Sequence, residues 1–221
     1  MNKKIISIGL AILCLLSLVG CNKSTSKGTF EPMIKNLEWG MTESQVVSEL
    51  KDIEYTQSQG DTDLTNYIEL TDPIKKFGYN CTAVLCFSKD LNTNLKDEGI
   101  LSSIVLQYSD VKKDKLLSEL KSCLGDNCKE SSVTPGLKSY VWDSKKTMKD
   151  IPKDSFNKIT SFLSNKAPNT SESALLPTID DPVNRIIFRI AESDSGSSLT
   201  VTYYGQWERV LNYLKNTQVL Q

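Results

Sequence analysis

Thiols are the most reactive side chains that this chain offers, because it contains six cysteines and no histidine. Four of them, Cys81, Cys86, Cys123 and Cys128, form two Cys-x4-Cys pairs in the body of the chain. Paired cysteines can bind zinc, but structural zinc sites hold their cysteines in tight knuckles. The first pair falls in a strand-like run, so the pattern favours buried thiols or disulfides over a metal site.

Four cysteines allow three disulfide pairings. If residues 79–88 form one extended strand, Cys81 and Cys86 lie about 17 Å apart and are too distant to bond. Cys123 and Cys128 flank Leu-Gly-Asp-Asn at an expected helix end, where the chain can double back. We therefore predict a single Cys123–Cys128 bridge; the alternative is two bridges that tie the strand to this helix end.

The absence of histidine removes the usual general base, the common nucleophile pairs and the commonest metal ligand. A histidine-free glycoside hydrolase needs two carboxyl groups on facing elements, about 5–10 Å apart. Asp180-Asp181 and the acids between residues 90 and 98 are typical of turns instead. Asp61-Thr62-Asp63 lacks the glycine and distal glutamate of a calcium loop. We expect no catalytic residue, metal or cofactor.

The first twenty-one residues combine two lysines, an apolar run from Ile5 to Val19, and a cysteine. The run is short for a membrane-spanning helix, which needs about 20 apolar residues. The tetrad Leu18-Val19-Gly20-Cys21 resembles a bacterial lipobox. That resemblance implies that residues 1–20 are a signal peptide, that the Cys21 thiol is acylated, and that the mature chain begins there.

Two simpler interpretations stay open: Cys21 is an ordinary cysteine after a cleaved signal, or the apolar segment is an uncleaved anchor. Acylation is physically sufficient for anchoring, because each buried CH₂ contributes about 0.8 kcal/mol and two chains hold where one is marginal. The polar residues 21–29 are expected to form a flexible tether. Export would also place the remaining thiols in a compartment that permits disulfides.

Charge argues against a nucleic-acid partner. The formal net charge is −1, and no basic tract appears in the sequence. The lipobox resemblance implies instead that the chain meets the membrane through lipid on Cys21, on the extracytoplasmic side.

Hydrophobic periodicity predicts one α+β domain over residues 30–221, an antiparallel sheet with helices packed on one face. A long loop is expected at 165–182. Tyr203, Tyr204 and Trp207 could form an aromatic patch, but alternation directs only one tyrosine outward, which favours core packing. Strands are expected at residues 53–56, 65–70, 79–87, 100–108, 138–142, 185–191 and 198–204, and helices at 43–51, 111–124 (capped by Asp110), 153–164 and 206–215.

The stretch from Trp39 to Val46 contains the sharpest folding signal in the body of the chain. Thr42 and Gln45 fit a capping box, Gly40 permits the turn before it, and Trp39 is an expected core residue. With the strands and Leu-rich helix that follow, residues 37–140 resemble modules of β-lactamase-inhibitor-protein-like proteins and of the small lipoprotein of the outer-membrane assembly machine. These modules pack helices on a four-stranded antiparallel sheet and bind proteins.

The resemblance, the lipobox and the missing histidine predict a non-catalytic, membrane-anchored lipoprotein that binds another protein of the cell envelope. The alternative is a tethered module that binds a small ligand or a polysaccharide.

Overall fold

A computed structural model describes residues 30–34, 36–60, 65–89, 98–166, 176–193 and 196–217. Within these ranges the chain forms a nine-stranded antiparallel sheet and four α-helices. The predicted α+β class, with helices packed on one face of an antiparallel sheet, is confirmed. The predicted signal peptide, the tether and Cys21 lie outside the described residues.

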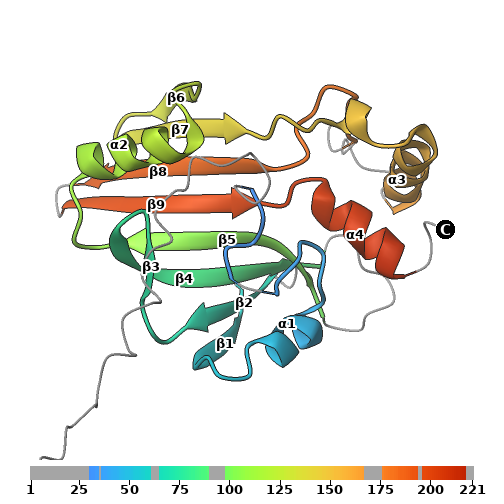
Figure 1. Cartoon of the computed structure of the whole chain (residues 1–221), viewed down its shortest axis with the longest axis horizontal. Helices are drawn as coiled ribbons and strands as arrows, with labels where there is room; N and C mark the ends of the chain where they lie inside the picture. The colour runs from blue at the N-terminus through green and yellow to red at the C-terminus, as the bar shows by residue number, and fades with distance from the viewer. Residues whose placement is uncertain are drawn as a thin grey trace, which may run out of the picture.

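The two halves of the described chain share one plan, a helix followed by an antiparallel run of strands (Figure 1). The elements of the first half are α1 (Glu43–Glu49), β1 (Tyr55–Gln59), β2 (Thr65–Leu70), β3 (Ile74–Lys76), β4 (Tyr79–Ser88) and β5 (Ile100–Tyr108). Those of the second half are α2 (Lys113–Leu124), β6 (Lys129–Thr134), β7 (Leu137–Asp143), η1 (Met148–Asp150), α3 (Lys153–Lys166), β8 (Arg185–Ser193), β9 (Gly196–Tyr204) and α4 (Glu208–Asn216).

The strand order β1-β2-β4-β5-β9-β8-β7-β6 places the last strand of each half at the centre of the sheet. β5 and β9 pair antiparallel there, while the short β3 pairs with β4 outside this path. The halves are therefore related by a pseudo-two-fold axis between β5 and β9. In Figure 1, α1 and α2 lie at opposite corners of the sheet, as such an axis requires.

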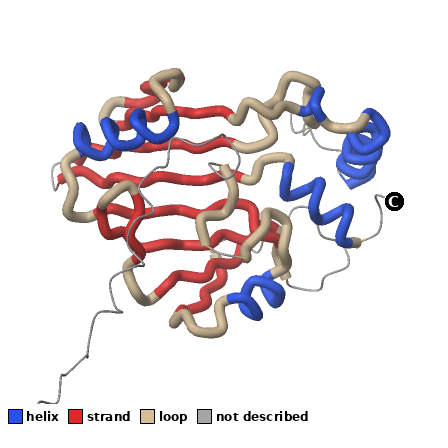
Figure 2. The backbone as a smooth tube through the Cα atoms, in the orientation of Figure 1, coloured by secondary structure: helices blue, strands red, loops and turns tan. Residues whose placement is uncertain are grey.

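The main core lies between the sheet and the helices α1 and α2. Leu116 and Leu120 of α2 and Val46 of α1 are fully buried against it. Figure 2 shows the strands as one continuous layer, with α2 lying over part of it. The strand registers align a row of buried side chains across the sheet, formed by Ile68, Leu85, Ile104, Tyr203, Ile186 and Trp142.

A smaller core joins α3 and α4 beyond one end of the sheet (Figure 1). Ile159 of α3 and Val210 and Leu214 of α4 are fully buried in it. α4 also contacts the segment before α1, because Asn212 Nδ2 donates a hydrogen bond to the Trp39 carbonyl at 3.0 Å. α4 thus fixes the turn that precedes α1.

Trp39 and Thr42 occupy the places predicted for them. Trp39 is fully buried, and its indole N–H donates to the Phe30 carbonyl at 3.0 Å. The capping box is complete: the Gln45 N–H donates to Thr42 Oγ1, and the Thr42 N–H donates to Gln45 Oε1. Gly40 has a φ of 87°, the left-handed conformation that favours glycine.

Two local predictions were wrong: the cap of α2, and the bounds of the first strand, which was expected at residues 53–56 and is found as β1 at Tyr55–Gln59. α2 begins at Lys113 after the N-cap Lys112, and Asp110 instead accepts a hydrogen bond from the Ser109 hydroxyl. The strands β3 and β6 were not predicted, because β3 is three residues long and β6 is mainly polar.

Candidate functional site

The side of the sheet that faces away from α1 and α2, here called the outer face, displays an ordered set of side chains. Alternation along each strand selects its residues, and the strand registers align them into rows. The central row runs across seven strands as Glu69, Val84, Val105, Thr202, Ile187, Val141 and Lys129. Its middle five residues are all β-branched, and acidic and basic residues stand at its two ends.

The central row is only partly shielded by its neighbours. Val84, Val105, Ile187 and Val141 are half-buried, and Thr202 between them is 3% exposed. Neither hydrophobic cluster of the described residues includes any of these five side chains. The outer face therefore presents an apolar strip that no described helix covers.

A second row beside the central row carries charge and aromatic rings. It consists of Tyr67, Cys86, Ser103, Tyr204, Arg185 and Asp143. Asp143 accepts hydrogen bonds from Arg185 Nε at 2.9 Å and from Lys129 Nζ at 2.8 Å. Partial burial would raise the pKa of the Asp143 carboxyl, but the hydrogen bonds from Lys129 and Arg185 outweigh it, so its pKa lies below the ordinary value. This ion-pair network borders the apolar strip.

A third row, on the other side of the strip, is polar. It contains Thr82, Gln107, Thr200, Arg189, Ser139 and Ser131. Arg189 is exposed, so its guanidinium is open to an acidic group of a partner. Over β6 to β8 the outer face thus carries Lys129, Arg185 and Arg189 against the carboxylate of Asp143, and Glu69 stands at the opposite end of the central row.

A polar pocket lies at the corner between α1 and the β1–β2 hairpin. Its lining is Glu43, Gln57, Ser58, Gln59, Asn66 and Lys89. The Glu43 carboxylate accepts hydrogen bonds from Gln57 Nε2 at 3.2 Å and from Asn66 Nδ2 at 2.7 Å. Carboxylate, amide and ammonium groups of this kind can bind hydroxyl groups of a small polar ligand. α1 positions Glu43 in its first turn, because the capping box fixes where that helix begins.

The thiols depart from one prediction. Cys128 is a free thiol, as are Cys81 and Cys86, so the predicted Cys123–Cys128 bridge is not present. Gly125 ends α2, its carbonyl accepts a hydrogen bond from the Trp142 indole, and Cys128 leads directly into β6. Cys81 and Cys86 lie in the single strand β4, and burial raises the pKa of both thiols.

Of the carboxylates weighed for catalysis, those at residues 90–97 lie outside the described residues. Asp181 accepts a hydrogen bond from the Thr178 N–H at 2.8 Å, which closes a local turn. No group of three or more cysteine, aspartate or glutamate side chains in the described ranges is arranged to hold a metal ion. Tyr203 is buried in the main core, whereas Tyr204 faces outward, as alternation predicts. The motif Asp61-Thr62-Asp63 lies outside the described residues.

Sequence reasoning missed the outer face and the pocket. The sequence did contain a signal for the outer face, since Val84, Val105 and Ile187 make both faces of their strands apolar. The strand order that aligns these residues could not be read from the sequence. The pocket brings together residues 14 and 23 positions apart. Residues at these separations are not related by helix or strand periodicity, so the sequence contains no signal for the pocket.

None of the helices in the described ranges has the length and apolar character to cross a bilayer. Family models, curated proteins and solved structures yield no match to this chain. The resemblance of residues 37–140 to inhibitor-type modules therefore stays a prediction.

Proposed function

We propose that the protein is a non-catalytic binding protein, anchored through lipid on Cys21 at the extracytoplasmic face of the membrane, whose outer face docks another protein of the cell envelope. One observation carries the docking role. β-Branched side chains form an unbroken strip over β4, β5, β9, β8 and β7, and no described helix packs on it.

The composition of the outer face fits an interface better than an ordinary solvated face. Antiparallel sheets that face water alternate apolar inward and polar outward, whereas the five middle positions of the central row are all β-branched and are half-buried or buried. The strip is flanked by the Asp143–Arg185–Lys129 network on one side and by Arg189 on the other. An apolar centre with a charged rim is the usual anatomy of a protein interface.

Docking is tested with a chain that carries a photo-reactive amino acid in place of Val105. This chain is cross-linked by illumination in the cell-envelope fraction. We expect one discrete cross-linked species, which disappears when Ile187→Lys is added. The matched control carries the photo-reactive group at Ile179, an exposed apolar residue away from the sheet (58% exposed). Equal cross-linking from both positions, or none from Val105, would overturn the docking role. Thermal melting of Ile187→Lys shows whether the fold is intact.

Anchoring is tested separately with Cys21→Ser. We expect the parent chain to incorporate labelled fatty acid and to partition into detergent, and the variant to do neither. A variant that stays in the membrane fraction as fully as the parent, with no acyl label in either, would remove the anchor from the proposal. The docking experiment would be unaffected by that result.

The polar pocket supports a second candidate function, binding of a polysaccharide or small polar ligand. Its specific support is the Glu43 carboxylate, which two amides hold in an open pocket. Retention on immobilised envelope glycans that is lost in Glu43→Gln would favour this function. Equal retention of the parent and the variant would exclude this pocket as the site.

A further inference from the structure

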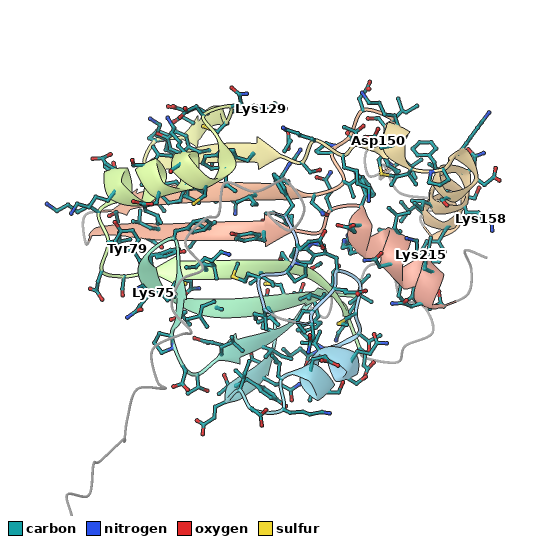
Figure 3. The ribbon with its side chains drawn as sticks, viewed as in Figure 1. Lys75, Tyr79, Lys129, Asp150, Lys158 and Lys215 are labelled. Carbon is teal, nitrogen blue, oxygen red and sulfur yellow. The ribbon has the colours of Figure 1, made fainter. Side chains whose placement is uncertain are left out.

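The two edges of the sheet differ in their protection against strand addition. β6, at one edge, carries Lys129 and Glu130 and has a register shift between Ser132 and Thr134. Figure 3 shows the Lys129 side chain at this margin of the sheet. Charged residues and bulges are the devices that natural proteins use to block pairing between edge strands.

β1, at the opposite edge, lacks these devices. Its sequence Tyr-Thr-Gln-Ser-Gln contains no charge and no proline, and its register with β2 is continuous over all five residues. Among the described strands it pairs only with β2. An uncharged edge strand with neither proline nor a bulge is a template for another strand.

Hydrogen bonds at both ends of the hairpin show which groups of β1 face outward. The Thr71 N–H donates to the Glu54 carbonyl at 2.9 Å, and the Gly60 N–H donates to the Thr65 carbonyl at 2.8 Å. Bonded positions alternate in an antiparallel ladder, so even-numbered residues such as Ser58 bond to β2. Tyr55 and Gln57 therefore direct their N–H and C=O groups away from the sheet.

We propose that β1 pairs antiparallel with β1 of a second copy of this chain, about a two-fold axis that passes through Gln57. An antiparallel strand pair is self-complementary about such an axis, because each copy offers the same donors and acceptors to the other. The absence of charge on β1 means that no like charges meet across the axis. The pairing joins two sheets edge to edge and leaves the protected β6 strands at the outer ends.

The proposal does not depend on the lipid anchor or on docking at the outer face. It predicts that the two Gln57 residues form a directly opposed, hydrogen-bonded pair, with Cα atoms about 5.5 Å apart. That separation allows a disulfide between cysteines. Thr56 would instead lie opposite Ser58 of the other copy, too far from its own equivalent to bond.

The first experiment measures the protein mass of the purified full chain by light scattering, for the parent and two variants. Gln57→Pro removes the outward N–H together with the side-chain contact with Glu43, whereas Gln57→Ala removes that contact alone and keeps the N–H. We expect dimers for the parent and Gln57→Ala, and monomers that still unfold cooperatively for Gln57→Pro. Ser58→Pro should lower the melting temperature, since its N–H bonds to β2. A monomeric parent, or a Gln57→Pro variant that stays dimeric, would overturn the proposal.

The second experiment tests the position of the axis. Mild oxidation of Gln57→Cys should give a covalent dimer, and Thr56→Cys and the parent should not. Comparable dimer from both variants, or none from Gln57→Cys, would overturn the pairing about Gln57. A Gln57→Cys chain that cross-links to a different protein would show that β1 accepts another partner's strand and would likewise overturn self-pairing.

Discussion

Gly205 lies so close to Trp39 that no side chain can be added to it. A Cβ built on Gly205 would stand 2.4 Å from Cδ2 of the Trp39 indole, which is fully buried and cannot move aside. Gly205 connects β9 to α4, so this contact packs the turn before α1 against the junction of β9 and α4. We expect Gly205→Ala to lower the free energy of unfolding by about 1–3 kcal/mol, measured by urea denaturation.

The double variant Gly205→Ala with Trp39→Leu tests the cause. If the contact with the indole is responsible, the smaller leucine makes room for the new methyl group, and the double variant loses less stability than the two single changes together. Strict additivity would show that the cost of Gly205→Ala has another origin.

Gly40 and Gly78 form a matched pair for separating backbone strain from steric overlap. Their φ angles are 87° and 82°, but a Cβ on Gly40 would lie 2.4 Å from the Arg209 carbonyl oxygen, whereas a Cβ on Gly78 meets nothing within 4 Å. Gly78→Ala should cost about 1 kcal/mol from the left-handed backbone alone. Gly40→Ala should cost about 1–3 kcal/mol more. Equal losses in denaturation experiments would contradict the overlap.

Removing the Thr42 side chain should weaken α1 by about 1 kcal/mol, the usual cost of losing an N-cap hydrogen bond. Thr42→Ser keeps the hydroxyl oxygen that accepts from the Gln45 N–H and should recover most of the loss. Hydrogen exchange of the α1 amides localises the effect. Identical behaviour of the alanine and serine variants would show that the cap contributes nothing.

The Asp143 network should make stability depend on pH in acid. Because the pKa of Asp143 is lowered in the folded state, its contribution is fully present above the unfolded-state value of about 3.9 and is lost as the pH falls through the folded-state value. Asp143→Asn should therefore cost about 1 kcal/mol at neutral pH, and the difference from the parent should shrink as the pH falls through the folded-state value. Lys129→Ala, which leaves the Arg185 bond in place, should cost less, since Lys129 is 80% exposed. A loss that is constant across the pH range would rule out the ion pairs as its source.

Thiol labelling should distinguish the free cysteines. Burial raises the pKa of Cys81 and Cys86, which lowers the thiolate fraction that reacts with alkylating agents. Cys128 is only half-buried, so iodoacetamide should modify it first in the native, unreduced protein, as peptide mass spectrometry would show. A Cys128 that is protected until a reductant is added would restore the bridge predicted from the sequence.

Periodicity was sufficient for the elements whose burial follows a simple rule. The bounds predicted for β2 and β5 match the structure, because apolar residues mark their inner face. In α2, Leu116 and Leu120 repeat at helical spacing and are both buried. Each of these signals is local, so one sequence is enough to read it.

The rest depends on pairing between distant residues. β6 is a strand because β7 pairs with it, since its own residues are mainly polar. The outer face forms because β5 pairs with β9, and no local sequence pattern predicts that pairing. The pocket around Glu43 likewise requires α1 to pack beside β1 and β2. Long-range contacts of this kind leave no periodic trace along the chain.

The pairing of β5 with β9 also sets the order in which the protein is completed. Ser103 of β5 pairs with Tyr204 of β9, about a hundred residues later in the chain, so the middle of the sheet cannot form until β9 is present. Until the β8–β9 hairpin has been synthesised and has folded, β5 is an unpaired apolar edge strand, and such edges promote aggregation. A chain cut short before β9 would therefore lose far more than its final two elements, because both halves would be left with an open margin where the molecule should be continuous.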